Sequence, residues 1–168
     1  LTMQVRAGAL PTFPAVVPYP FDAPIGDTWS IPLGTALGSG GNPNHELMAG
    51  FSDVPGLLST GTAGSGKSVG VNALITGALL RGWELVVVDA PHKAVDFLWC
   101  KDFCRPGGWG CDSKEQALTA LDLVYEHGQK IARLLKKHEA QKVGDLPERL
   151  RPAPVLIVVD EATALFML

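Results

Sequence analysis

Hydrophobic and polar positions divide the chain into an irregular beginning and a longer stretch with strand and helix patterns. Residues 1–27 contain prolines at positions 11, 14, 18, 20 and 24, and proline both fixes φ and removes an N–H donor, so we expect an extended lead-in here. Residues 28–34 predict a short strand, residues 38–44 a turn and residues 45–50 a returning strand. A β-hairpin should therefore open the main domain, which we place at residues 28–168.

From residue 54 onward, strand and helix patterns alternate. The segment PGLLST, residues 55–60, predicts a short strand that leads into a glycine-rich loop. Residues 69–80 are apolar nearly all round, which is typical of a helix packed between a sheet and its neighbours, and Arg81-Gly82 supplies a basic last turn and a glycine cap. Residues 84–89, ELVVVD, form a continuous apolar run ending in an acid, the pattern of a strand covered on both faces.

The second half continues the alternation. Asp112 and Ser113, followed by Glu115 and Gln116, offer overlapping capping boxes for a long helix that Gly144 and Pro147 would end. We expect the apolar face of this helix to consist of Leu118, Leu121, Tyr125, Ile131 and Leu135. Residues 154–161 predict a third buried strand. Strands that alternate with helices indicate an α/β sandwich with a parallel sheet and right-handed crossovers.

Composition fits an ordinary globular domain and excludes several classes of protein. The chain has 168 residues, of which 46% are hydrophobic and 18% charged, with a net charge of −3. This charge gives no general attraction to nucleic acid or anionic membranes, so such binding would need a local basic patch or a ring of subunits. The apolar runs are too short to span a bilayer and no signal pattern precedes them, so we expect a cytoplasmic protein whose membrane tether, if it has one, lies outside this chain.

Neither end of the chain has the form of a natural terminus. The chain starts at Leu1 and stops at Leu168, within an apolar stretch just past the third strand. We interpret it as a piece of a longer protein or the product of a truncated gene.

Three cysteines lie within twelve residues, at positions 100, 104 and 111. A zinc site is conceivable, but the spacing C-x₃-C-x₆-C is not that of a standard zinc knuckle. Reduced thiols are the favoured interpretation.

The strongest motif is the phosphate-binding loop G-x-x-x-x-G-K-[ST], which spans residues 61–68. Backbone N–H groups of such a loop point at phosphate oxygens, and the helix that follows adds the positive end of its dipole. Lys67 would reach the β- and γ-phosphates of ATP, and the Ser68 hydroxyl would bind Mg²⁺. A glycine-rich turn with an incidental lysine is the alternative, and the predicted strand before the loop and helix after it disfavour that reading. The residues expected to hold the nucleotide are Gly61, Thr62, Ala63, Gly64, Ser65, Gly66, Lys67 and Ser68.

The second half of this site is Asp160-Glu161, at the carboxyl end of the third strand, where open parallel sheets bind their ligands. Asp160 would hold Mg²⁺, and Glu161 would act as the general base that activates water. An acid pair that serves only a helix dipole is the alternative. The chain lacks the LSGGQ-like segment of a transporter ATPase, and a small GTPase lacks the second acid, which leaves the motor ATPases of the RecA and HerA kind.

At these motifs the sequence resembles the FtsK/SpoIIIE family of DNA-translocating ATPases over roughly residues 28–168. The resemblance rests on DVPGLLSTGTAGSGKSVGVNALITGALL, on VVVDAPHKAVDFLW and on PVLIVVDEATALFML, and it extends to IPLGTALGSGGNPNHELMAGFSDVPGLL. It implies a P-loop ATPase domain with a RecA/HerA-like three-layer sandwich, incomplete at its C-terminus. It also implies ATP and Mg²⁺ as cofactors, double-stranded DNA as a partner bound without sequence preference, and a homo-hexamer.

The sequence departs from the family pattern in places. Ser59 and Thr60 make the first strand unusually polar, and Ala90 and His92 interrupt a D-P-K motif, which leaves the roles of Asp89 and Lys93 open. Later strands with sensor residues, an arginine finger and a winged-helix domain are missing.

The basic residues of segment 129–151 could touch DNA, but a solvated helix face is the favoured interpretation. Two other functions stay open: an FtsK-like ATPase that drives protein export, and a module that binds nucleotide without hydrolysis.

Overall fold

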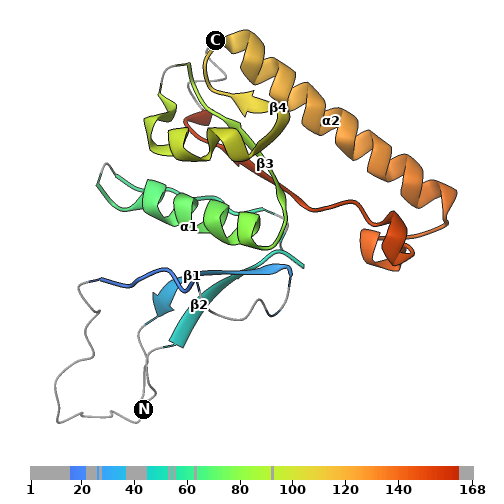
Figure 1. The fold of residues 1–168 in the computed structure, drawn as a ribbon, viewed down its shortest axis with the longest axis horizontal. Helices are drawn as coiled ribbons and strands as arrows, with labels where there is room; N and C mark the ends of the chain where they lie inside the picture. The colour runs from blue at the N-terminus through green and yellow to red at the C-terminus, as the bar shows by residue number, and fades with distance from the viewer. Residues whose placement is uncertain are drawn as a thin grey trace, which may run out of the picture. The chain divides into compact units, whose positions relative to one another are not determined.

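The computed structural model describes residues 16–21, 26, 28–36, 45–52, 54, 56–62, 64–91 and 93–162. The chain forms two compact units, Leu1–Ser59 and Thr60–Leu168, which are described in turn (Figure 1). Most of the expected proline-rich lead-in falls outside the described residues, and the predicted start of the main domain at residue 28 stays a prediction.

The first unit contains the predicted hairpin. Strands β1 (Ser30–Ala36) and β2 (His45–Gly50) pair antiparallel, from Ser30 opposite Gly50 to Ala36 opposite His45. The register shifts between Pro32 and Gly34, where proline has no N–H to donate to the ladder. The prediction of two strands is confirmed, and the turn expected at 38–44 lies outside the described residues.

The second unit is an α/β fold with a parallel sheet in the strand order β4-β3-β5, so this level of the fold prediction is confirmed. Its elements in chain order are α1 (Lys67–Leu80), β3 (Glu84–Val88), the 3₁₀ helix η1 (Ala94–Phe103), β4 (Cys104–Gly110), α2 (Lys114–Lys137), the 3₁₀ turns η2 (Val143–Asp145) and η3 (Glu148–Leu150), and β5 (Val155–Val159).

Strand β3 is the centre of this unit because its side chains are covered on both faces. Leu85, Val86, Val87 and Val88 are all fully buried. Val86 and Val88 pack against Ala117 and Ala120 of α2, and alternation along the strand directs its other side chains to the opposite face. Figure 1 shows α1 and α2 on opposite sides of β3. The prediction that this apolar run is a strand covered on both faces is therefore confirmed.

Helix α1 runs antiparallel to the strands, which determines where its first turn lies. It begins at Lys67, two residues before the predicted start. Gly82 closes it with a φ of 73° and an N–H bond to Leu79 O at 3.0 Å, as the sequence predicts. Only Arg81, Gly82 and Trp83 separate it from β3, and it packs along β3 and β5. Its first turn is therefore directed toward the carboxyl ends of the strands.

Helix α2 begins where the capping pattern predicts but presents a different face to the sheet. Ser113 is the N-cap and accepts a hydrogen bond from the Gln116 N–H at 3.2 Å. The buried positions are Ala117 and Ala120, because Gly110 of β4 approaches so closely that only small side chains fit between them. The predicted face is therefore wrong in its first half, where Leu118, Leu121 and Tyr125 are 53%, 40% and 68% exposed.

The end of α2 also differs from the prediction. The helix stops at Lys137, well before Gly144 and Pro147. Glu139 takes a left-handed φ of 54°, and the Ala140 N–H bonds to Leu135 O at 3.0 Å while the Glu139 N–H bonds to Lys136 O at 3.3 Å. This is a Schellman cap with glutamate where glycine is usual, and no sequence signal marks it.

Three strand predictions need correction. Residues 56–60 form no strand and are exposed, in keeping with the polar Ser59 and Thr60. Strand β4 was not foreseen, because a proline and three glycines hide its pattern. Strand β5 forms but is not fully buried: it lies at one edge of the described sheet, so Ile157 and Val159 are 42% and 46% exposed.

Candidate functional site

The glycine loop before α1 has the backbone that its sequence predicts. Gly64 and Gly66 have φ values of 77° and 90°, which L-residues rarely adopt. Position 61 favours glycine for a different reason: a Cβ there would overlap the Ser65 side chain. The Ser65 N–H bonds to Thr62 O at 3.2 Å and closes the turn. Ala63 lies outside the described residues.

Lys67 folds back over this loop. Its Nζ donates to Gly61 O at 2.7 Å and to Thr62 O at 3.2 Å. The ammonium group is thereby held at the mouth of the loop and not extended into solvent. The acceptors in both bonds are uncharged carbonyl oxygens. A negatively charged phosphate oxygen could take their place and form a stronger, charge-assisted bond with the ammonium group.

The first turn of α1 has free capacity for an anion. Its first intrahelical bond runs from Gly70 N–H to Gly66 O, so the N–H groups of Lys67, Ser68 and Val69 have no acceptor within the helix. Gly66 offers no side-chain cap and no acid occupies the first turn. Helix α2 shows the opposite arrangement, with Ser113 as its cap and Glu115 in its first turn. The loop and helix start thus fit a phosphate group.

The acid pair follows β5 directly. The Asp160 N–H bonds to Val88 O at 3.0 Å and continues the ladder with β3 by one residue. The Asp160 Oδ1 accepts the Glu161 N–H at 2.9 Å, and Glu161 has a left-handed φ of 45°. A non-glycine residue in this region is strained by about 1–2 kcal/mol, and such strain tends to occur at functional sites.

Asp89 is a third acid at this edge, and sequence reasoning left its role open. It follows β3 directly and is 1% exposed, with Oδ1 accepting the Ala90 N–H at 2.6 Å. Burial raises the pKa of its carboxyl group, and the negative charges of Asp160 and Glu161 raise it further, while Lys93 and the Ala90 bond act in the opposite direction. The sequence signal for this residue was its place as the acid that ends the apolar run ELVVVD. His92 lies outside the described residues.

The fold brings these groups to one rim of the sheet. Asp89 and Asp160 end adjacent parallel strands, and the direction of α1 places Lys67 and Ser68 toward the same rim. Asn72 of α1 ties the helix to the segment after β3, by accepting the Trp99 Nε1–H at 2.9 Å. Within the described part of the chain, Lys67 forms no ion pair with Asp160 or Glu161, and the roles of these residues stay predictions.

In the ranges that the structure describes, no three His, Cys, Asp or Glu side chains are grouped so as to hold a metal ion. None of the described helices combines the length and apolarity needed to cross a bilayer.

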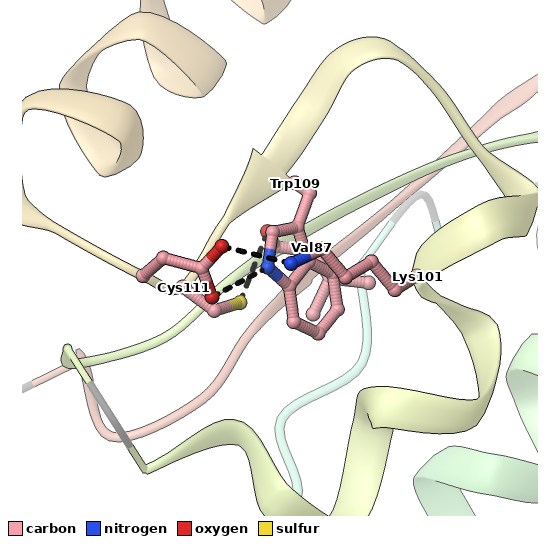
Figure 2. A network of polar contacts seen from close by, with 5 residues as sticks. Val87, Lys101, Trp109 and Cys111 are labelled. Atoms are coloured by element: carbon pink, nitrogen blue, oxygen red, sulfur yellow. Dashed lines mark hydrogen bonds and ion pairs between the residues drawn. The ribbon is translucent and has the colours of Figure 1, made fainter.

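A polar network lies on the other side of β3, around β4 (Figure 2). Lys101 pairs with Asp112 at 2.9 Å and lies 5.3 Å from the centre of the Trp109 ring, and Trp109 Nε1–H donates to Asp112 at 3.0 Å. Between its pairings at Cys104 and Trp109, β4 bulges away from β3. A cavity of about 540 Å³ opens beside this bulge. The sequence offered no motif for it.

The basic segment 129–151 is mostly a solvent-exposed surface. Most of its lysines and arginines are exposed, but Arg151 donates to Leu146 O and Gly144 O, both at 2.8 Å. Arg151 therefore helps to hold the η2 and η3 turns together. This agrees with the interpretation that most of this segment is a solvated face.

Comparison with known proteins supports the expected resemblance. The chain matches no protein-family model. It is 32% identical to the DNA translocase FtsK of Helicobacter pylori over 150 residues, which is 82% of this chain and 17% of that protein. It is 28% identical to the transfer protein TraSA of Streptomyces ambofaciens over 68% of this chain and 29% of that protein. It is 25% identical to the DNA translocase FtsK of Pseudomonas putida over 84% of this chain and 20% of that protein.

These relatives are much longer than the chain, which spans about a sixth of the Helicobacter protein. The matches nonetheless cover most of the chain's own length. The chain belongs to the FtsK/SpoIIIE family.

Proposed function

We propose that the chain is the nucleotide-binding part of a P-loop ATPase motor, with a RecA/HerA-like fold, that hydrolyses ATP to translocate double-stranded DNA. Two of the relatives described above are named DNA translocases. The observation that carries the proposal is the glycine loop at 61–66, which leads into a helix start with three N–H groups free of helical acceptors and no side-chain cap. A hexameric ring with DNA in its centre is the form in which we expect the motor to work.

Each residue of the site has a separate task. The loop amides and the first turn of α1 would hold the phosphates, and Lys67 would exchange its two carbonyl acceptors for phosphate oxygens. Ser68 and Asp160 would hold Mg²⁺, which when bound neutralises phosphate charge. Glu161 would take a proton from the attacking water.

Asp89 adds negative charge near Asp160 and Glu161. The negative charges of Asp160 and Glu161 disfavour the ionised form of Asp89, and a divalent cation held by Ser68 and Asp160 would offset that repulsion. This supports Mg²⁺ as the companion of the nucleotide.

Nucleotide binding tests the loop. Lys67→Ala removes a charge-assisted bond of about 1.5–3 kcal/mol, so the affinity for Mg·ATP should fall roughly 10- to 150-fold in titration calorimetry. Lys130→Ala, which removes an exposed lysine of α2, is the matched control and should leave the affinity unchanged. Equal affinities for Lys67→Ala and the original chain would refute the phosphate site.

Hydrolysis tests the acid pair, and full-length protein is needed for it. Glu161→Gln should keep nucleotide affinity and lower turnover by about two to four decades, whereas Glu148→Gln in η3 should leave turnover unchanged. Duplex DNA should stimulate the ATPase. Activity indifferent to duplex DNA would instead favour protein export, and binding without any turnover would favour a non-hydrolysing module.

A further inference from the structure

The three cysteines flank β4: Cys100 lies in η1, Cys104 begins β4 and Cys111 directly follows it. The Cys100 Sγ–H donates to Phe97 O at 3.0 Å, and the Cys104 Sγ lies 3.6 Å from Cys100 O. The Cys111 Sγ–H donates to Val87 O at 3.5 Å, in the centre of β3 (Figure 2). All three are free thiols. The spacing of the cysteines is not that of a standard zinc knuckle, and the described residues contain no metal-binding cluster.

Of the three cysteines, Cys100 and Cys104 influence each other most strongly. The contact of the Cys104 Sγ with Cys100 O holds the two residues together, and the interaction between their thiols lowers the pKa of Cys100 and raises that of Cys104. Such an arrangement stabilises one thiolate next to a second sulfur, which is the starting point for disulfide formation.

Access to the pair is one-sided. Cys100 is fully buried, whereas Cys104 is partly exposed and lines the cavity of about 540 Å³ beside the β4 bulge. The same cavity is lined by Arg105, Gly107 and Trp109. A small oxidant can therefore reach Cys104 from solvent, whereas Cys100 is shielded from solvent.

We propose that Cys100 and Cys104 form a reversible oxidation site, in which a peroxide that enters the cavity converts the two thiols into an intramolecular disulfide. The inference is independent of the proposed ATPase activity.

The chemistry balances in two steps. The Cys104 proton first passes to the Cys100 thiolate, and the Cys104 thiolate attacks one oxygen of the peroxide and becomes a sulfenic acid; the hydroxide that leaves takes the proton back from Cys100 and becomes water. The Cys100 thiolate then attacks the Cys104 sulfur, the S–S bond forms, and the hydroxyl group departs with a proton as a second water. Overall, two thiols and one hydrogen peroxide give one disulfide and two waters. A thiol reductant reverses the reaction by exchange.

Cys111 is a poor competitor for either sulfur. It is 1% exposed, its thiol is engaged with Val87 O, and burial raises its pKa to about 12. Gly110, directly before it, is paired with Val88. We therefore expect Cys111 to stay reduced when the other two are oxidised.

The sequence allows a direct test by peptide mapping. A lysine-specific protease cuts after Lys93, Lys101 and Lys114, so Cys100 and Cys104 fall in separate peptides, 94–101 and 102–114. After treatment with hydrogen peroxide and alkylation of free thiols, the two peptides should appear joined, with a mass two hydrogens below their sum. Thiol reductant should separate them. The absence of joined peptides under conditions that oxidise an exposed model dithiol would overturn the proposal.

The variant Cys111→Ser separates the two pairings that would both join these peptides. The proposal requires the joined peptides to persist in Cys111→Ser and to be lost in Cys100→Ser. Loss of the joined peptides in Cys111→Ser, with circular dichroism showing an intact fold, would overturn it by assigning the bond to Cys111. Peptide 102–114 alone, lighter by two hydrogens, would assign the bond to Cys104 and Cys111 and would overturn it as well.

Discussion

The contact between β4 and α2 depends on the missing side chain of Gly110, and Gly110→Ala perturbs it most directly. An added Cβ would lie 2.9 Å from the Ala117 Cα, 3.0 Å from the Ala120 Cβ and 3.2 Å from the Gln116 carbonyl oxygen. Ordinary carbon contacts are about 3.5–4.0 Å. Two of these three neighbours are helix backbone atoms, which cannot rotate aside, so the helix and the strand must separate.

The expected cost follows from these distances. Overpacking of a fixed contact costs about 1–3 kcal/mol, and the upper half of that range applies because β4 is also paired to β3 at Gly110. Replacing glycine by alanine recovers about 0.4–1 kcal/mol by restricting the unfolded chain. The net loss should be about 1–2.6 kcal/mol, which lowers the Tm by about 2–10 °C for a chain of this size.

Thermal denaturation followed by circular dichroism measures this loss, and Gly128→Ala is its matched control. Gly128 is in the middle of α2, and an added Cβ would meet nothing within 4 Å. The same substitution there should raise stability by about 0.5–1 kcal/mol through helix propensity. The two variants should therefore shift the Tm in opposite directions. An unchanged or raised Tm for Gly110→Ala would refute the close packing of β4 on α2.

Two further predictions concern the caps and the rim. Ser113→Ala removes the acceptor of the Gln116 N–H and should cost about 1 kcal/mol in urea denaturation, whereas Ser113→Asn should restore most of it. Asp89→Asn should raise the Tm relative to the original chain, and the difference should grow as pH rises. The Tm is measured with a chelator present. The folded-state pKa of Asp89 is raised, so its penalty is complete above that pKa and disappears below the unfolded value of about 3.9. A pH-independent difference in Tm between Asp89→Asn and the original chain would contradict this.

Sequence patterns predicted those elements whose own residues determine them. The run at 84–88 is apolar at every position but its first, so its burial on both faces needed no knowledge of the partners. The glycine loop and the Ser113 cap are local motifs that act within a few residues, and their backbone geometry follows from that.

What the patterns missed depends on contacts between distant segments. The face of α2 could not be foreseen, because Gly110 selects the small residues Ala117 and Ala120 over the larger Leu118 and Leu121. Ile157 is exposed because β5 lies at an edge of the described sheet, and the sequence of β5 does not reveal that position. The burial of Asp89 is likewise a property of its neighbours.

The uncapped beginning of α1 has a consequence for how this segment responds to its ligand. Backbone amides that lack acceptors make a helical turn fray, and protons there exchange quickly with solvent. An anion that satisfied them would add its binding free energy to every opening that destroys the site, local fraying of this turn included. Because fraying controls exchange here, binding of the ligand should be seen most clearly as slowed exchange at residues 67–69.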